Sequence, residues 1–235
     1  MNKTLYTIGY AGKQIDEFIK LLKIHGITCL IDVRTSPFSK TFPEYDKNRL
    51  KETLKANNIL YAHFGEEFGA RRVEQEAYTL SYNLKGEQFE QVDFSKVENL
   101  PSFRKGVDRI FNAVEQGFKI CFMCSEKHPI DCHRFWLVAY YFATLSDYFD
   151  IINIISENET QTFMDVINEV DLASEKKKFY KEHNELQSVS LIQLDIPKWV
   201  QYWDKFFSNN ESDVRKKWVY SNNRIGYKKG FDEND

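Results

Sequence analysis

The first 155 residues alternate between short apolar runs and longer segments in which apolar residues recur at helical spacing. The runs are nearly continuous and rich in β-branched residues, which is typical of parallel strands covered on both faces. They predict five strands, at residues 5–10, 27–33, 59–64, 119–124 and 149–155.

The segments between these runs have the pattern of amphipathic helices. In the clearest case, Ile15, Phe18, Ile19 and Leu22 follow the i, i+3, i+4, i+7 spacing, and Gly26 provides a stop signal. The last helix of the series is apolar nearly all round, which predicts deep burial. The expected helices cover residues 15–25, a short segment capped by Asp46 with Leu50 and Leu54 on one face, 101–117 and about 131–144, and one more is expected near 72–82 within the irregular stretch 65–100.

Strands that alternate with helices favour a parallel sheet, because each crossover helix returns the chain to the same end of the sheet. We therefore predict a three-layer α/β fold, with an open, mostly parallel sheet of about five strands and helices on both faces. After about residue 156 the pattern changes to helical segments near 160–184 and 195–208. The predicted division is an α/β domain at 1–156 and a helical C-terminal extension at 157–235 that packs on it.

Composition and charge narrow the class of protein. The net charge of −3 gives no global positive field of the kind that nucleic-acid-binding proteins present. No run approaches the roughly 18 apolar residues of a membrane span, and no signal-peptide pattern opens the chain. The four cysteines are then expected to be reduced thiols of a cytoplasmic protein without a membrane partner. The oligomeric state is not determined, and a homodimer stays open.

Four short motifs occur in order along the predicted α/β domain: TIGY at 7–10, DVRTSP at 32–37, GARR at 69–72, and the C-S-E and C-H-R elements within 124–134. Together they resemble the family catalogued as Domain of Unknown Function 488 (DUF488), over about residues 3–155. The resemblance implies the fold and a site but no activity, because the family has none assigned. Ala70 departs from the family, which often has a second glycine there. The residues carried over are Arg34, Pro37, Arg71, Cys124, Glu126, Cys132, His133 and Arg134.

Polar residues follow four of the predicted strands at their carboxyl ends. Ligands of open parallel sheets bind outside these ends, so we expect the polar residues to line one shared cleft. Separate strands each contribute polar residues to this edge of the sheet. Their common position is therefore stronger evidence for a functional site than polar residues elsewhere in the chain. These residues are Tyr10, Asp32, Arg34, His63, Cys124 and Glu126.

A helix that begins after Asp131 has Cys132, His133 and Arg134 in its first turn. Free backbone N–H groups and the positive end of the helix dipole favour an anion there, such as a phosphate or carboxylate group bound by arginines. The alternative for Arg134 is an ion pair that holds the preceding loop, with Asp32 or Glu126 as the partner. The expected substrate-binding residues are Tyr10, Asp32, Arg34, Arg71, Cys124 and Arg134.

Three residues of this region are candidates for catalysis. Glu126 and His133 can act as an acid/base pair. Cys132 is better placed as a nucleophile than Cys124, because a helix N-terminus lowers the pKa of a thiol. The alternatives are an ion pair for Glu126 and a packing role for the cysteines.

No metal and no cofactor are expected. Adjacent residues such as Cys132 and His133 point about 100° apart on a helix, which is awkward for shared coordination. Cys121 and Cys124 have the C-x-x-C spacing, but residues three apart in a strand face opposite sides. No G-x-G-x-x-G or P-loop motif follows any predicted strand.

The C-terminal tail offers a second functional surface. Residues 215–229 contain six Lys and Arg residues, with Trp218, Tyr220 and Tyr227 interleaved, a combination used to contact single-stranded nucleic acids. The alternative is a solvated end whose aromatic residues dock on the body. The sequence therefore favours an enzyme acting on an anionic, nucleotide- or nucleic-acid-related substrate. The competing hypothesis is a non-catalytic nucleic-acid or ligand-binding module.

Overall fold

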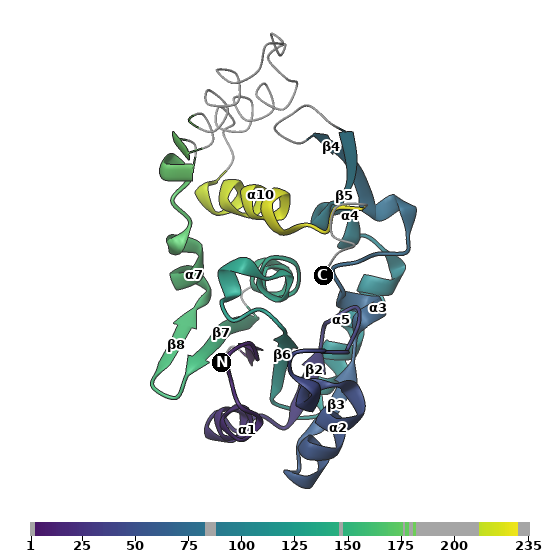
Figure 1. Ribbon diagram of the computed structural model, residues 1–235, viewed down its shortest axis with the longest axis vertical. Coiled ribbons are helices and arrows are strands. Elements are labelled where there is room, and N and C mark those ends of the chain that lie inside the picture. The colour runs from purple at the N-terminus through teal and green to yellow at the C-terminus, as the bar shows by residue number, and fades with distance from the viewer. Residues whose placement is uncertain are drawn as a thin grey trace.

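A six-stranded sheet with the order β3-β2-β6-β1-β7-β8 forms the centre of the protein (Figure 1). The computed structural model describes residues 3–82, 88–145, 148–175, 177–178, 181 and 212–229. All neighbouring strands of the sheet are parallel except β7 and β8, which are antiparallel. The strands are β1 (Lys3–Gly9), β2 (Cys29–Asp32), β3 (Leu60–His63), β6 (Ile120–Cys124), β7 (Phe149–Ser156) and β8 (Glu159–Thr162).

The predicted fold class is confirmed. Each of the five apolar runs forms one of the parallel strands, since a sheet with helices on both faces buries every residue of its central strands. The sheet also continues past residue 156, because the chain turns back as β8 and pairs with β7. The last strand of the sheet therefore lies inside the predicted C-terminal extension.

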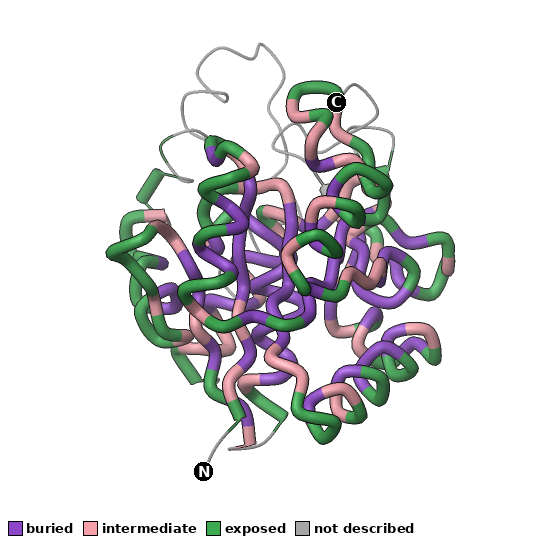
Figure 2. Tube along the Cα trace, turned by 90° about the horizontal axis from the view of Figure 1, so that it is seen from below, coloured by how far each residue is buried: buried purple, intermediate pink, exposed green. Residues whose placement is uncertain are grey.

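Helices cover the two faces of the sheet. Side chains alternate between the faces along each strand. In β6, Cys121 and Met123 join the core under α1 (Ile15–Ile24) and α2 (Lys47–Ala56), whereas Phe122 and Cys124 join the opposite core. The helices of that second face are α5 (Pro101–Glu115) and a π-helix (Arg134–Ala139) that continues as α6 (Tyr140–Leu145). Figure 2 shows the buried residues in the middle of the molecule, with exposed residues around them.

The helix on the second face begins later than predicted. Pro129–Asp131 form a single 3-10 turn, and Cys132 is extended, with φ −133° and ψ 139°. The π-helix then begins at Arg134. Cys132 therefore precedes the helix, and His133, whose backbone is helical, begins it, so the predicted start near residue 131 is about two residues too early.

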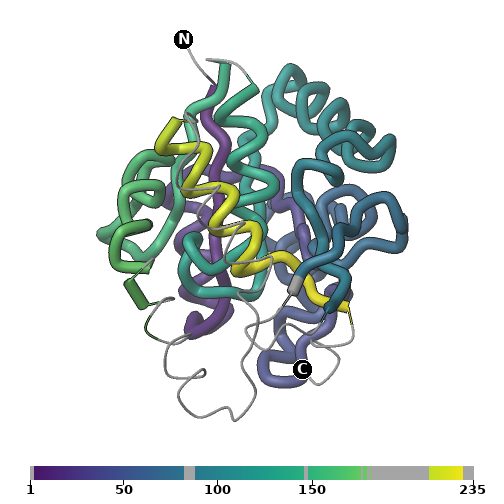
Figure 3. The backbone as a smooth tube through the Cα atoms, turned by 90° about the horizontal axis from the view of Figure 1, so that it is seen from above, coloured from purple at the N-terminus to yellow at the C-terminus, as the bar shows by residue number. Residues whose placement is uncertain are grey.

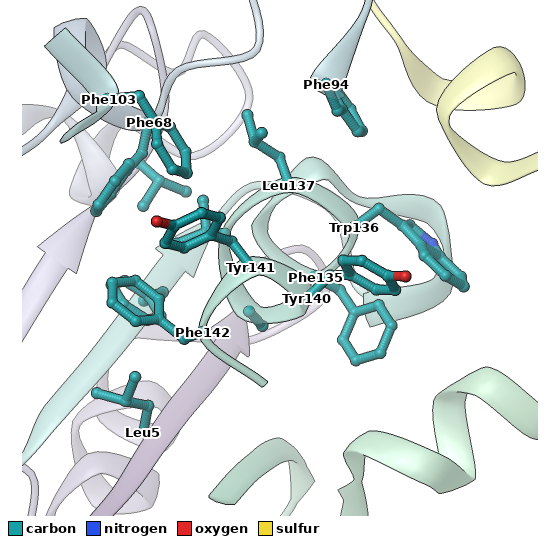
Figure 4. Close-up of a cluster of buried hydrophobic side chains, with 14 of the residues drawn as sticks. Leu5, Phe68, Phe94, Phe103, Phe135, Trp136, Leu137, Tyr140, Tyr141 and Phe142 are labelled. Carbon is teal, nitrogen blue, oxygen red and sulfur yellow. The ribbon is translucent and has the colours of Figure 1, made fainter. Parts of the chain in front are cut away.

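The burial predicted for this helix is confirmed, because every residue of the π-helix is buried. Figure 4 shows the aromatic side chains of the π-helix and of α6 leaving on opposite sides. Phe135, Trp136 and Tyr140 point to one side, and Tyr141 and Phe142 point to the other, toward Phe68 and Phe103.

An antiparallel hairpin replaces the helix predicted near 72–82. It consists of β4 (Tyr78–Tyr82) and β5 (Gln88–Val92), preceded by a 3-10 turn at Gln75–Ala77. The helix prediction was wrong because the short segment Tyr78–Tyr82, which contains β-favouring Tyr and Thr residues, pairs with β5 instead. Short helices precede and follow the hairpin, α3 (Gly65–Phe68) and α4 (Phe94–Val97), and a further 3-10 turn at Pro43–Tyr45 precedes α2.

The C-terminal helix α10 (Asp213–Ile225) packs across the π-helix (Figures 1 and 3). Its residue Trp218 is buried, and the indole N–H donates a 2.7 Å hydrogen bond to the carbonyl of Trp136. Before it, Thr162 and Asp165 form a capping box at the start of α7 (Phe163–Glu169). The helix predicted at 195–208 lies outside the described residues.

Glu98, at the end of α4, makes the stability of the protein sensitive to pH. Burial raises the pKa of Glu98 to about 7, and the nearby charges of Arg215 and Arg104 only partly offset this effect, while Asp93 adds to it. Its Oε1 atom is buried and has no hydrogen-bond partner among the described residues. A raised carboxyl pKa means that the folded protein binds the proton more tightly, so this group lowers stability as pH rises through the interval up to about 7.

Glu98→Gln is therefore expected to have little effect at pH 4.5 and to stabilise the protein at pH 8. The gain is up to about 3 kcal/mol, since each unit of pKa corresponds to about 1.4 kcal/mol. Urea unfolding of the variant and the wild type across this pH range measures the difference. A stability difference that does not change with pH would contradict the assignment.

Candidate metal centre at the carboxyl ends of the strands

The strand register brings the predicted site residues to one edge of the sheet. Gly9, at the end of β1, pairs with Cys124 at the end of β6. Asp32, at the end of β2, lies between Met123 of β6 and His63 of β3. The loops that follow these strands therefore lie side by side, and they hold all the residues considered below.

Four side chains converge just beyond the end of β6: Cys124, Glu126, Cys132 and His133. One potential ligand atom from each lies within 4.8 Å of the others. His133 Nδ1 is 3.8 Å from Cys124 Sγ and 4.0 Å from Cys132 Sγ. The Cys132 thiol also donates a 2.8 Å hydrogen bond to Glu126 Oε2. We call these four residues the Cys-His-Glu cluster.

Local backbone structure explains this convergence. Cys124 is the last residue of β6, and Glu126 follows it in the loop. Cys132 is extended rather than helical, so the 100° separation expected for adjacent helical residues does not apply to Cys132 and His133. The geometric reason for expecting no metal is thereby removed. Cys121 faces the opposite core, in agreement with the strand-alternation argument.

The second ring nitrogen of His133 defines its hydrogen-bonding state. Nε2 lies 3.1 Å from the carbonyl oxygen of Val33, at the end of β2. A carbonyl can only accept, so Nε2 carries a proton, and in the neutral ring Nδ1 has a free lone pair directed toward the cysteines. Metal-bound histidines are held in the same way, with the second nitrogen donating to a carbonyl or carboxylate.

Electrostatic interactions within the cluster separate the two thiols. Burial opposes ionisation of Cys124, but the neighbouring Cys132 side chain and the positive charge of His133 outweigh it and lower the pKa of Cys124 to about 6. Burial raises the pKa of Cys132. The sequence favoured Cys132 as the more reactive thiol, whereas the structure makes Cys124 the more acidic one.

Interactions within the cluster also favour the charged forms of His133 and Glu126. Burial disfavours the charged form of His133, but the thiolate of Cys124 and the carboxylate of Glu126 raise its pKa to about 9. Burial likewise opposes ionisation of Glu126, yet the charge of His133 lowers its pKa to about 2. Ser125, the middle residue of the C-S-E motif and not among the predicted site residues, donates a 2.9 Å hydrogen bond to Glu126.

Arg34 is engaged in a buried network rather than facing a ligand. Its guanidinium donates two hydrogen bonds to Asp32, one to the hydroxyl of Tyr10 and one to the carbonyl of Tyr45. Tyr61 completes the set by donating to Asp32 at 2.8 Å. Burial disfavours the charge of Arg34, but the hydrogen bonds and charge of Asp32 outweigh it and raise the pKa of Arg34. Arg34, Asp32 and Tyr10 thus hold the loop after β2.

Arg134 lies beneath the loop after β6. It is fully buried and donates to the main-chain carbonyls of Glu126 and Lys127, at 2.7 and 3.2 Å. This loop-holding arrangement resembles the alternative considered for Arg134, with carbonyl groups in place of carboxylates. Its Nε atom has no acceptor among the described residues.

Arg71 and His63 lie elsewhere on this edge. Arg71 is exposed, and its guanidinium lies over the ring of Tyr227, 5.0 Å from the centroid. His63 Nε2 lies 2.8 Å from the carbonyl of Arg34. The three arginines predicted to clamp an anion therefore have three different sets of contacts.

The tail residues predicted to contact nucleic acid are partly used in the fold. Trp218 and Lys217 are buried, and Lys217 forms an ion pair with Asp213. Arg215 stacks on Trp218, with 3.9 Å between the guanidinium carbon and the ring centroid. Tyr220 donates a hydrogen bond to Glu175. These contacts agree with the alternative in which the aromatic residues of the tail dock on the body of the protein.

The fold and the site together define an α/β protein with a buried cluster of two cysteines, a histidine and a carboxylate at the carboxyl edge of its sheet. The family model described as domain of unknown function DUF488 matches residues 14–141. The chain belongs to the DUF488 family. Neither the curated proteins nor the solved structures contain a match. Among the described residues, no helix has the length and apolar character needed to cross a membrane.

Proposed function

We propose that this protein is a metal-dependent hydrolase that acts on an anionic substrate. Cys124, Cys132 and His133 bind a divalent transition-metal ion, and Glu126 occupies or borders the fourth position. The proposal rests on one observation above all, the convergence of four ligand atoms within 4.8 Å.

The donor set and its spacing suit zinc. Zinc prefers sulfur and nitrogen ligands in a tetrahedron, and bonds of about 2.3 Å to sulfur and 2.0 Å to nitrogen separate two such ligands by roughly 3.6 Å. The two sulfur–nitrogen distances, 3.8 and 4.0 Å, are close to that value. The thiols are only 2% and 1% exposed, so an ion reaches them more readily than a bulky substrate does.

Glu126 is the member of the cluster suited to proton transfer. It is less buried than the other three and lies in a loop, so it can leave the ion without unfolding a strand. A zinc ion with three protein ligands lowers the pKa of a bound water to about 7. Such an ion would supply an activated water, for which Glu126 would be the proton acceptor, and His133 would hold the ion as a ligand rather than act as an acid/base group.

Metal analysis of the purified protein tests this proposal. We expect about one zinc ion per chain, and replacement by cobalt should produce the thiolate-to-metal charge-transfer band of a cysteine-ligated site. Cys124→Ala, Cys132→Ala and His133→Ala should each lose most of the metal. Cys121→Ala is the matched control, because it removes a buried thiol from the same strand on the opposite face.

A wild-type protein that binds neither zinc nor cobalt, or a Cys121→Ala variant that loses the metal equally, would refute the metal centre. In that case the second candidate is a thiol-dependent enzyme, favoured by the 3.8 Å approach of Cys124 Sγ to His133 Nδ1. It predicts that iodoacetamide labels Cys124 before Cys121 in metal-free protein. The nucleic-acid module has less support, since Trp218 and Lys217 are buried.

A further inference from the structure

The C-terminal helix α10 holds the turn that precedes Cys132. Arg224, near the end of α10, donates a 2.6 Å hydrogen bond from Nη2 to the carbonyl of Ile130. Its Nη1 atom lies 3.0 Å from Asp131 Oδ1. Ile130 and Asp131 are the last two residues of the 3-10 turn at Pro129–Asp131, and Cys132 follows them directly. One guanidinium group thus contacts both residues immediately before a member of the Cys-His-Glu cluster.

The position of Cys132 depends on this turn more than the positions of its neighbours do. Its backbone is extended, with φ −133° and ψ 139°, and its N–H donates a 3.1 Å hydrogen bond to the carbonyl of Pro129, at the start of the turn. In contrast, Cys124 is fixed as the last residue of β6, and the ring of His133 is bound to the carbonyl of Val33. A movement of the turn would therefore displace the thiol of Cys132 relative to the rest of the cluster.

Helix α10 contacts the chain on both sides of Cys132. Before it, the carbonyl of Ile130 accepts hydrogen bonds from Arg224 and from the indole N–H of Trp136, at 2.6 and 2.8 Å. After it, the carbonyl of Trp136 accepts the hydrogen bond from Trp218 of α10. Arginine suits the first contact because its planar guanidinium presents several donors in a fixed geometry. The helix is thus placed to restrain Cys132 from both directions.

This contact comes from outside the part of the chain that the family model matches, residues 14–141. The sequence grouped Arg224 with the basic residues of the tail that could bind nucleic acid, whereas the structure directs its guanidinium to the body of the protein. The side chains of Arg224 and Asp131 are 38% and 52% exposed. An ion pair this exposed contributes little to global stability, so its effect is expected at the turn rather than on the whole fold.

We propose that Arg224 is a positioning residue that holds Cys132 in the orientation required for metal binding. This inference deepens the proposed function and rests on it for the metal. Groups that orient a metal ligand from outside change the affinity for the metal by about 10- to 100-fold when they are removed. Arg224 acts through the turn rather than on the thiol itself, so the lower end of this range applies.

Zinc affinity, measured by competition with a chelator, tests the proposal. Arg224→Met is expected to bind zinc about tenfold more weakly than the wild type. Lys216→Met is the matched control, because it removes the same charge from the same helix, about two turns away from Arg224, and it should bind zinc as tightly as the wild type. Arg224→Lys should recover only part of the affinity, because lysine keeps the charge but lacks the planar fork.

Thiol labelling of the metal-free protein gives a second readout, which does not depend on the metal. In the presence of a chelator, iodoacetamide should label Cys132 several times faster in Arg224→Met than in the wild type or in Lys216→Met, because local opening of the turn exposes the thiol. Cys121 reports general loosening of the fold, since it is buried in the opposite core. Its labelling rate should be the same in all three proteins.

The inference is overturned if Arg224→Met binds zinc as tightly as Lys216→Met, or if the labelling rates of Cys132 and Cys121 rise equally in Arg224→Met. A wild type that binds no metal would reject the metal centre, and labelling then decides the role of Arg224. A selective rise for Cys132 keeps Arg224 as the residue that positions this thiol, and an unchanged rate rejects it.

Discussion

Replacing Asp32 with asparagine is expected to destabilise the protein by about 3–5 kcal/mol, the usual effect of removing one partner of a buried ion pair. The side chains of Asp32 and Arg34 are 0% and 5% exposed, and their closest atoms are 2.6 Å apart. The substitution leaves the guanidinium charge buried without compensation. It also weakens the bonds that Asp32 accepts from the backbone of Arg34 and from the hydroxyl of Tyr61. Urea unfolding measures the loss.

Two comparisons test the cause. Glu157→Gln breaks the Lys20–Glu157 pair, whose members are 58% and 52% exposed, and should change stability by less than about 1 kcal/mol. The double variant Asp32→Leu with Arg34→Met removes both buried charges and should recover part of the stability lost in Asp32→Asn. If Asp32→Asn has as small an effect as Glu157→Gln, the buried network does not stabilise the fold as described.

Trp218→Ala is expected to destabilise the protein by about 3–5 kcal/mol, the usual range for truncating a buried aromatic side chain. The indole packs against Tyr140 and Phe94, with ring centroids 5.4 and 6.4 Å away, and its N–H bonds to the carbonyl of Trp136. Removing it leaves a cavity between α10 and the π-helix. A lowered midpoint in urea with a single cooperative transition would show that α10 belongs to the same folding unit as the sheet.

Trp218→Phe separates packing from hydrogen bonding. It keeps most of the apolar volume and should cost about 1–3 kcal/mol, because the carbonyl of Trp136 loses its donor. Met164→Ala, at a half-exposed position on α7, should stay within about 0.5 kcal/mol of the wild type. An unchanged stability for Trp218→Ala would instead support a tail that is free to contact a nucleic acid.

Local pattern was sufficient for the main elements of the fold. Continuous apolar runs such as the one ending at Cys124 identify strands that are buried on both faces, and the spacing of Ile15 to Leu22 identifies a helix. It failed for Tyr78–Tyr82, where a short mixed segment suits a strand or a helix and pairing with β5 decides the outcome. Such pairing joins residues six to fourteen positions apart, so the periodicity within one short segment does not encode it.

The candidate site shows the same division. The edge of the sheet and the motifs that carry Cys124, Glu126, Cys132 and His133 follow from the sequence, because parallel strands place their carboxyl ends together. The sequence does not predict which of these residues meet. Their convergence depends on the extended backbone of Cys132, between a 3-10 turn and the π-helix. The role of Arg134 is likewise decided by the loop that packs over it.

By itself, the sequence determined the family, the α/β class and the edge of the sheet where chemistry-bearing residues gather, since all three depend on motifs and on the periods of local structure. Only the tertiary structure decided that two thiols, an imidazole and a carboxylate converge, and that Arg34 and Arg134 are engaged in the fold. The physical reason is that ligand geometry and charge compensation depend on distances between separate loops, which packing sets and local pattern does not.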